Sequence, residues 1–373
     1  MIKLSDIKTP AYISDVNSFE NNIIDILSIV RSKYNNFDVG YSYKTNYYIP
    51  FLDKAMSLGL YAEVVSPNEC SLAQCIGNEK SNIIYNGVIH DFETKLDIAR
   101  SGGIVNIENI PELTHFIEWS NQSRTHIELG IRVNFDVGNG LISRFGIDIT
   151  GDDFLWLSNQ DNHPYISFKC VHFHLGGARD PEYFRYRVKK TVEIAKVLGA
   201  TIVDIGGNIY GRMGDDFKAQ LPFAAPTLEE VCYAIGDEMS KCCPDGKIKL
   251  IAECGSPIAS NAMHLLTTVT NINKVRGKVF VTTDCRNTDA GWSISRYDPT
   301  REYYGKCESG VINATVCGCE CREKDILIRN YSGPLSIGGK LLIKNIGSYS
   351  YSVTNDFITP GCSNVIDISE IVF

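Results

Sequence analysis

The sequence predicts an α/β fold in which a (β/α)8 TIM-like barrel is joined to a C-terminal antiparallel β domain. Eight short runs of β-branched and aromatic residues alternate with segments of helical spacing between residues 38 and 252. This span is close to the ~250 residues that such barrels need. After residue 255 the helical spacing fades, and short alternating runs punctuated by Gly and Pro follow. We therefore expect residues 25–255 to form the barrel, and residues 1–24 and 256–373 to form the β domain.

The expected barrel strands are short, and helical segments lie between most of them. The strands are Asp38–Tyr43, Leu60–Val65, Asn82–Tyr85, Ile104–Ile107, Ile127–Asn134, Phe168–His174, Thr201–Ile205 and Ile248–Ala252. The helices are Ile49–Leu58, Pro67–Ile76, Asp91–Ser101, Pro111–Ser120, Pro181–Leu198 and Thr227–Cys242. Ser66 and Asp180 each precede a proline, which predicts a capping side chain followed by proline at the first helical position.

The expected β domain draws on both ends of the chain. Its C-terminal runs are Leu265–Thr270, Lys278–Thr283, Gly310–Val316, Asp325–Ile328, Lys340–Ile343 and Ser348–Val353. Near the N-terminus, Ala11–Ser14 has the pattern of a strand and Asn17–Arg31 that of a helix. Because this strand precedes the barrel, we expect it to pair with the C-terminal sheet, so that the chain crosses between the domains at both ends of the barrel.

Composition and charge exclude several classes of protein. The 373 residues are 44% hydrophobic and 21% charged, which is typical of a globular chain and not of a disordered one. The formal net charge of -8 argues against binding to nucleic acid or to an anionic membrane, and no run approaches the ~20 apolar residues of a membrane helix. The first 15 residues lack the apolar stretch of a signal peptide, and the 13 cysteines are scattered, so we expect a cytoplasmic protein with reduced thiols.

Polar residues collect where the expected barrel strands end, which is where barrel enzymes build their sites. These residues are Lys44, Glu63, Asn86, Arg132, Asn134, His172, His174, Gly206, Gly207 and Glu253. A lysine in this position either extends its amine to the rim of the barrel or forms a Schiff base with a carbonyl group. The paired glycines either let backbone N–H groups approach a phosphate or form an ordinary turn between a strand and a helix.

The histidines and the C-terminal cysteines leave metal binding open as an alternative. His172 and His174 share one face of a strand and could bind zinc, or one ring could lie flat on an aromatic cofactor while the other supports it. The chain has seven histidines and no obvious third ligand, which favours the cofactor interpretation. Cys317, Cys319 and Cys321 are spaced one residue apart rather than two to four, and no second cluster lies in range, which disfavours a structural zinc site. We expect them to be buried cysteines of the β domain, or one of them to be a catalytic acid.

Nine segments follow one another along nearly the whole chain in an order that is specific as a set. They are Thr9–Ile13, Tyr41–Asn46, Glu63–Glu69, Ser143–Gly146, His172–Gly177, Asp204–Gly207, Ala252–Ser256, Gly318–Asp325 and Gly347–Tyr349, with Phe357 after the last. In these segments the chain resembles the pyridoxal-phosphate-dependent fold-type III decarboxylases, a family that holds diaminopimelate, ornithine/arginine and carboxynorspermidine decarboxylases. Alanine racemase is a more distant relative.

The resemblance implies a cofactor, pyridoxal 5'-phosphate, and residues that hold it. Lys44 would be the Schiff-base lysine, His174 would stack on the pyridine ring, and Glu253 would keep the ring nitrogen protonated, which strengthens the electron sink. The other cofactor-binding residues would be Glu63, Gly206, Gly207 and the Tyr349 hydroxyl.

The resemblance also implies that the β domain takes part in catalysis. Cys321 would protonate the carbanion after carbon dioxide leaves, and in the family this cysteine reaches into the active site of a partner subunit. Arg144 and Asp325 fall where the family has an ion pair at the interface. We therefore expect a homodimer with shared active sites. Arg296 falls near a family arginine that meets a substrate carboxylate, or is an ordinary surface arginine.

Three departures from the family pattern concern the phosphate and the substrate. Asn208 replaces the third glycine of the phosphate loop and Ser256 replaces an arginine, so we expect somewhat weaker cofactor binding. Arg322 stands where the family has an acidic residue that receives the distal ammonium of the substrate. Because a guanidinium repels an amine and pairs with a carboxylate, we expect a substrate with an anionic or neutral distal end, bound by Arg322, Asp325 and Arg296, unless Arg322 points to solvent.

The expected function is therefore the decarboxylation of an amino acid, a diamino acid or a derivative of one, through a Lys44 Schiff base and proton donation by Cys321. An amino-acid racemase of the same fold is one alternative. A cofactor-binding protein without catalysis is a second, motivated by Asn208 and Ser256, and a metal-dependent barrel hydrolase is a third. We expect neither nucleic acid, membrane nor metal among its partners.

Overall fold

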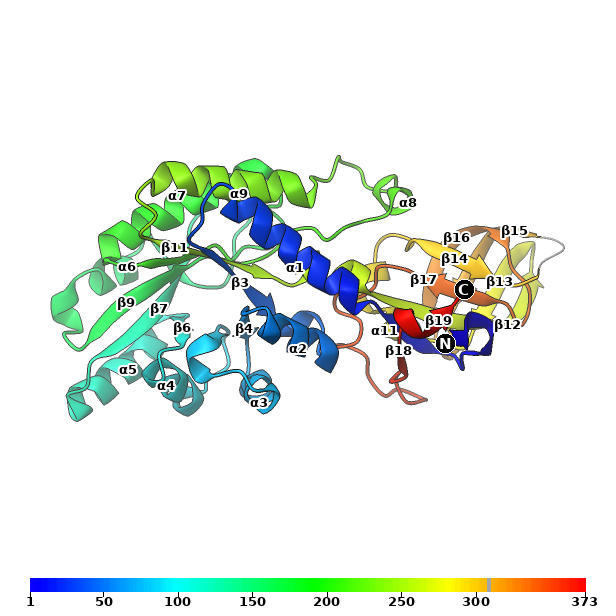
Figure 1. Cartoon of the computed structure of the whole chain (residues 1–373), viewed down its shortest axis with the longest axis horizontal. Coiled ribbons are helices and arrows are strands. Elements are labelled where there is room, and N and C mark those ends of the chain that lie inside the picture. The colour runs from blue at the N-terminus through cyan, green and yellow to red at the C-terminus, as the bar shows by residue number, and fades with distance from the viewer. Residues whose placement is uncertain (307–309) are drawn as a thin grey trace.

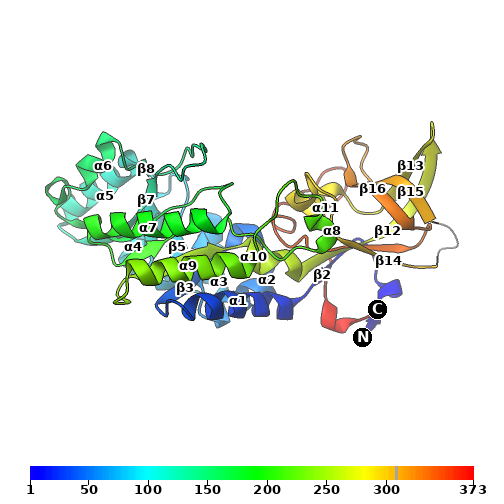
Figure 2. The same cartoon turned by 90° about the horizontal axis from the view of Figure 1, so that it is seen from above.

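A computed structural model of the chain describes residues 1–306 and 310–373. A barrel with its surrounding helices and a separate β domain lie end to end and form an elongated molecule (Figure 1). Both termini lie beside the β domain (Figures 1 and 2), where β1 (Ile2–Lys3) pairs with β19 (Ile371–Val372). None of the described helices is long and apolar enough to span a membrane.

Eight parallel strands close the barrel in the order in which they occur along the chain. They are β3 (Phe37–Ser42), β4 (Tyr61–Val64), β5 (Ile83–Tyr85), β6 (Ile104–Ile107), β7 (Ile127–Asn134), β9 (Ile166–His172), β10 (Ile202–Asp204) and β11 (Lys249–Cys254). The pairing of β11 with β3 completes the ring, and a short strand, β8 (Ile147–Asp148), pairs with the end of β7. Each of the eight expected strands overlaps one of these, so the barrel prediction is confirmed.

Helices cover the outside of the barrel, with α1, α7 and α9 on one side and α2 to α5 on the other (Figure 1). The helices are α1 (Val16–Arg31), α2 (Ile49–Ser57), α3 (Pro67–Ile76), α4 (Phe92–Arg100), α5 (Ile110–Ser123), α6 (Asp152–Leu157), α7 (Pro181–Leu198), α8 (Asp215–Lys218), α9 (Leu228–Cys242) and α10 (Ser256–Ala259). Short 3-10 turns are η1 (Leu4–Asp6), η2 (Tyr43–Thr45), η3 (Lys80–Asn82), η4 (Gln160–Asn162), η5 (Ser260–Ala262), η6 (Gly291–Ile294) and η7 (Ile368–Glu370).

The two predicted helix caps differ in the structure. The Ser66 side chain accepts the N–H of Glu69, as expected for the first turn of α3. Asp180 precedes α7, but its side chain makes no capping hydrogen bond. Helix α9 instead shows a capping box between Thr227 and Glu230 that the sequence analysis did not single out.

The β domain is built around β12 (Met263–Val275), which pairs with three strands. Its strands, together with helix α11 (Asn287–Ala290), are β2 (Ala11–Ser14), β13 (Lys278–Thr283), β14 (Arg301–Tyr304), β15 (Gly310–Cys317), β16 (Ile326–Pro334), β17 (Lys340–Ile343) and β18 (Val365–Asp367). Most pairs are antiparallel, but β13 with β15 and β2 with β18 are parallel, so the sheet is mixed. Because β2 pairs with β12, the expected crossing of the N-terminal strand to the C-terminal sheet is found.

The expected strand Ser348–Val353 is wrong, because this segment forms bends and a turn. Tyr349 has φ 55°, a left-handed backbone conformation that a strand does not contain. Its N–H donates to the carbonyl of Thr45 at 2.9 Å, and the hydroxyl of Ser352 donates to the carbonyl of Lys44 at 2.8 Å. The segment therefore returns from the β domain to the end of β3. The domain boundaries at residues 24/25 and 255/256 stay a prediction.

Candidate active site

Side chains at the carboxyl ends of the barrel strands meet in one cavity of about 370 Å³, a volume within the usual range of ligand sites. The residues expected at the rim that line it are Lys44, Glu63, Asn86, Arg132, His172, His174 and Glu253. Arg144 and Phe145 line it as well. The barrel therefore brings together an amine, two imidazoles and two carboxylates from four different strands or the turns that follow them.

Lys44 lies in η2, the turn that follows β3. Its Nζ lies 2.5 Å from Oε2 of Glu63, whose side chain is 1% exposed, while the lysine side chain is 34% exposed to the cavity. Loss of water by itself lowers the pKa of Lys44, but the negative charges of Glu63 and Glu253 outweigh it and raise the pKa above its usual value. The amine is thus held as a cation, next to a carboxylate that can accept its proton.

Asn86 connects the two buried carboxylates of the cavity. Its Nδ2 donates to Oε1 of Glu63 at 3.0 Å and also to Oε1 of Glu253. Its own Oδ1 accepts a hydrogen bond from Asn106 at 2.7 Å. One amide thereby satisfies an oxygen of each carboxylate and fixes the distance between two like charges.

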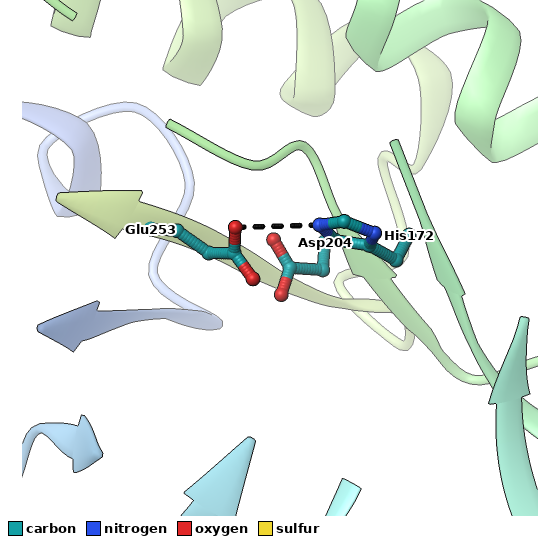
Figure 3. A group of neighbouring side chains, drawn as sticks. All are labelled: His172, Asp204 and Glu253. Carbon is teal, nitrogen blue, oxygen red and sulfur yellow. Dashed lines mark hydrogen bonds and ion pairs between the residues drawn. The ribbon is translucent and has the colours of Figure 1, made fainter. Parts of the chain in front are cut away.

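His172, Asp204 and Glu253 converge from the ends of β9, β10 and β11 (Figure 3). Nε2 of His172 lies 3.3 Å from Oε2 of Glu253, and one ligand atom of each of the three residues lies within 4.8 Å of the others. Burial raises the pKa of Asp204 and the charge of Glu253 raises it further, so Asp204 keeps its proton. Burial acts on Glu253 in the same direction, but His172 and Lys44 outweigh it and hold its pKa below the usual range. A protonated Asp204 beside an ionised Glu253 thus accounts for the burial of two neighbouring carboxyl groups.

His174 presents a neutral ring to the cavity. Loss of water around the ring lowers its pKa to about 3, and the positive charge of Lys44 acts in the same direction. The N–H of Gly207 donates to Nδ1 of His174 at 3.0 Å, which fixes this nitrogen as an acceptor. The ring is therefore an uncharged, oriented surface, suited to stacking rather than to ion pairing.

The Gly206–Gly207 turn has no room for side chains. Gly206 has a φ of +67°, and a Cβ on Gly207 would lie 2.3 Å from the carbonyl oxygen of Glu253. Both N–H groups already have partners within the chain, because Gly206 donates to Asp204 at 2.9 Å and Gly207 donates to His174. The glycines are thus required by close packing, and the predicted contact of their N–H groups with a phosphate stays a prediction.

Tyr349 approaches the cavity from the β domain. Besides its backbone bond to Thr45, its ring stacks on that of Trp292, with 5.4 Å between the ring centroids. The phenol lies near enough to Lys44 to raise the pKa of the amine.

The remaining predicted residues, Cys321, Arg322, Asp325 and Arg296, do not line the cavity of their own chain. Cys321 and Arg296 are exposed. Arg322 donates to Glu320 and to Asn287. The buried Asp325 carboxylate accepts the backbone N–H groups of Asn287 at 2.7 Å and Glu320 at 2.8 Å, so it orders its own loop.

Asp204 and Asn106 belong to the site but were not among the residues expected from the sequence. A signal for both was available, because each is a polar residue within a short apolar run, and β10 ends at Asp204. The pattern that drew attention to Glu253 therefore applied to them as well.

The cavity fits an aldehyde cofactor with a ring nitrogen. It offers a lysine amine for the aldehyde, a neutral imidazole for a ring face and a buried carboxylate for a ring nitrogen. The fold and the cavity together define an enzyme of the barrel type that uses pyridoxal phosphate. The family model "Pyridoxal-dependent decarboxylase, pyridoxal binding domain" matches residues 20–260, and the chain belongs to this family.

Relatives and solved structures of this kind match over nearly the whole chain. A diaminopimelate decarboxylase of Archaeoglobus fulgidus is 24% identical, over 96% of this chain and 87% of its own. An L-glutamyl-(BtrI acyl-carrier protein) decarboxylase of Niallia circulans is 25% identical, over 92% of this chain and 85% of its own. The solved structure of diaminopimelate decarboxylase from Helicobacter pylori complexed with L-lysine superposes with a TM-score of 0.83 at 20% identity, covering 98% of this chain and 93% of that one. This likeness confirms the fold: a barrel with a C-terminal β domain. The chain is a pyridoxal-phosphate-dependent amino-acid decarboxylase.

Proposed function

We propose that this decarboxylase acts on a diamino acid, or a derivative of one, whose distal end carries a carboxylate. The observation that carries the proposal is the pairing of the cations in the cavity. Lys44 pairs with Glu63 and Arg132 pairs with Glu108 at 3.1 Å. Arg144 is exposed and lies over the ring of Phe145, 4.0 Å from its centroid, and no carboxylate of the described residues lies within ion-pair distance of it. Asp325, its expected partner across the dimer interface, is buried and accepts two backbone N–H groups of its own loop, so within one chain Arg144 is the lining cation left to receive an anionic group.

The names of the relatives are consistent with such a substrate. Diaminopimelate carries a second carboxylate at its distal end, and the Niallia circulans enzyme is named for a glutamyl group attached to a carrier protein. Diaminopimelate and a carrier-bound glutamyl group differ in what lies beyond the reacting carbon, so the substrate panel must distinguish between these two kinds of substrate.

The residues of the cavity have distinct tasks in the proposed reaction. Bound pyridoxal phosphate supplies an electron sink for the electrons that remain when carbon dioxide leaves. Lys44 holds the cofactor, and Glu63 receives and returns the proton of its amine. Glu253 presents a buried negative charge that keeps a ring nitrogen protonated, and His174 covers a face of the ring with an uncharged surface.

The β domain supplies the proton donor in the proposed reaction. Cys321 is exposed and does not line the cavity of its own chain, so it would act in the cavity of a second copy, and Arg322 and Asp325 lie in the same loop. Arg322 already shares its charge with Glu320, which makes Arg144 the stronger candidate for the substrate carboxylate. The homodimer, the roles of Cys321, Arg322, Asp325 and Arg296, and a cytoplasmic location stay predictions.

A substrate panel tests this function. Carbon dioxide release should be faster with diaminopimelate and carboxylate-tailed amino acids than with ornithine or lysine, and Lys44→Ala should abolish it. Arg144→Gln should raise KM for the carboxylate-tailed substrates. Arg100→Gln should not, although Arg100 is also exposed and lies over an aromatic ring, that of Trp119. A preference for ornithine or lysine would overturn the substrate proposal, and loss of optical activity without carbon dioxide release would establish a racemase.

Mixing two inactive variants tests the shared site. Lys44→Ala and Cys321→Ala each remove one half of the proposed machinery. If the halves come from different subunits, the mixture regains activity that neither variant has alone. No recovery, with exchange of subunits demonstrated by a label, would place Cys321 outside the reaction.

A further inference from the structure

A second cavity, of about 190 Å³, lies where the loop that follows β10 meets the start of α10 and the β domain. Three cations line it, Arg179, Arg212 and Lys344, together with the hydroxyl-bearing residues Ser256 and Ser260. Its lining of described residues contains neither Asp nor Glu. A cavity with cations, hydroxyl groups and no carboxylate has the chemistry of an anion site.

Two of these three cations are already neutralised. Arg212 pairs with Asp25 at 2.7 Å and with Glu229 at 2.9 Å, and Lys344 pairs with Glu302 at 2.8 Å. Arg179 differs, because no described carboxylate lies within ion-pair distance of it.

The surroundings of Arg179 add positive charge. Arg187 is fully buried and donates to the backbone carbonyls of Gly207, Leu175 and Ala178, while its Nε has no hydrogen-bond partner among the described residues. Burial lowers the pKa of Arg187, and the charge of Arg179 lowers it further, so the two guanidinium groups repel each other. Two cations without a counter-ion are costly in a folded protein unless an anion joins them.

A continuous series of contacts leads from the Lys44 cavity to Arg179. His174, which lines the Lys44 cavity, accepts the N–H of Gly207. The next residue, Asn208, has a φ of 71° and accepts the Nε–H of Arg179 on its Oδ1 at 2.7 Å. Asn208 therefore orients the guanidinium, which a glycine at this position would not do. Because the N–H groups of Gly206 and Gly207 are engaged within the chain, an anion that passes this turn depends on Arg179 for its charge partner.

We propose that Arg179, oriented by Asn208, binds the phosphate group of the cofactor from the side of the second cavity. The inference rests on the proposed placement of the cofactor ring between His174 and Lys44. This contact would explain why an asparagine stands in the glycine turn. The charge of Arg179 would compensate for the arginine that Ser256 replaces.

The test compares two ligands that differ only in the phosphate. Binding of pyridoxal 5'-phosphate and of pyridoxal is measured by equilibrium dialysis for the parent protein, Arg179→Gln and Arg179→Lys. Arg185→Gln is the matched control. It removes a guanidinium from the same region, but Arg185 pairs with the exposed Glu182. We expect Arg179→Gln to weaken pyridoxal phosphate by about ten- to a hundredfold and to leave pyridoxal unchanged. Arg179→Lys should lie between the two, and Arg185→Gln should change neither ligand.

Inorganic phosphate distinguishes the cofactor from another source of the anion. In the parent protein it should compete with pyridoxal phosphate, and this competition should weaken in Arg179→Gln. If Arg179→Gln and Arg179→Lys both weaken the binding of pyridoxal phosphate and of pyridoxal to the same extent, Arg179 only holds the loop in place and the proposal is wrong. Phosphate that binds without competing would assign the second cavity to a different anion and overturn the proposal. A parent protein that binds neither ligand would instead contradict the proposed function.

Discussion

Replacing Asn86 with alanine should destabilise the fold far more than the loss of one surface amide. Asn86 is 4% exposed and donates to Glu63 and to Glu253, while it accepts from Asn106. The substitution removes the donor that both carboxylates share and leaves the amide of Asn106 without its acceptor.

The magnitude follows from the kind of bond that is lost. A hydrogen bond to a charged group contributes about 1.5–3 kcal/mol, so the two bonds together account for about 3–6 kcal/mol of the free energy of unfolding. Since domains are stable by only about 5–15 kcal/mol, this is a large fraction of the total. Asn82→Ala is the control, because its amide makes one bond, to the carbonyl of Leu60 at 2.9 Å, and should cost about 1 kcal/mol.

Urea denaturation of both variants, with equal m-values as a check, measures the two losses. A double-mutant cycle of Asn86→Ala with Glu63→Gln should give a coupling free energy of about 1 kcal/mol or more. If Asn86→Ala is no less stable than Asn82→Ala, the two carboxylates do not depend on the bridging amide, and the description of the site as one charged network is wrong.

Three further predictions concern the turn, the pH dependence and the proton donor. Gly207→Ala should abolish cofactor binding, because its Cβ would lie 2.3 Å from a backbone carbonyl oxygen. Gly176→Ala has open space around its Cβ and should leave the free energy of unfolding nearly unchanged. Calorimetry of cofactor binding and of unfolding, on both variants, checks this. Burial lowers the pKa of His264 from 6.5 to about 4. Between these values the unfolded chain binds more protons than the folded one, so the free energy of unfolding should fall by up to about 3 kcal/mol as the pH drops from 6.5 to 4. Urea titrations at several pH values should show a weaker pH dependence of this free energy for His264→Gln. Cys321→Ser should slow carbon dioxide release without weakening cofactor binding, whereas Cys319→Ser, also an exposed cysteine, should change neither; equal rates for the two variants would remove Cys321 from the reaction.

The alternation of strands and helices was sufficient to predict the barrel. Each barrel strand is a short apolar run, and polar side chains at or just past its end face the rim, so the ends of β3, β9 and β11 located Lys44, His174 and Glu253. The pattern predicts the fold because a strand followed by a helix occurs eight times, and each strand pairs with the strand that follows it in the sequence.

Periodicity failed where the chain follows tertiary contacts instead. Ser348–Val353 alternates like a strand, but the left-handed backbone of Tyr349 turns it toward Thr45 in the barrel. The bridge formed by Asn86 depends on two glutamates that lie 23 and 167 residues away in the sequence. Spacing along the chain carries no signal for such contacts, and the same holds for the approach of Arg179 to Asn208.

The charges of the site explain why its parts come from distant segments. Glu63 and Glu253 are buried, and two like charges in a low-dielectric interior repel strongly unless each has its own partners. Lys44 and Asn86 serve Glu63, while His172 and Asn86 serve Glu253. When the lysine amine gives up its proton to Glu63, that carboxyl becomes neutral, and Glu253 loses one of the cations that hold its pKa down. A cofactor whose ring nitrogen is protonated would supply Glu253 with a cation in place of the lost one.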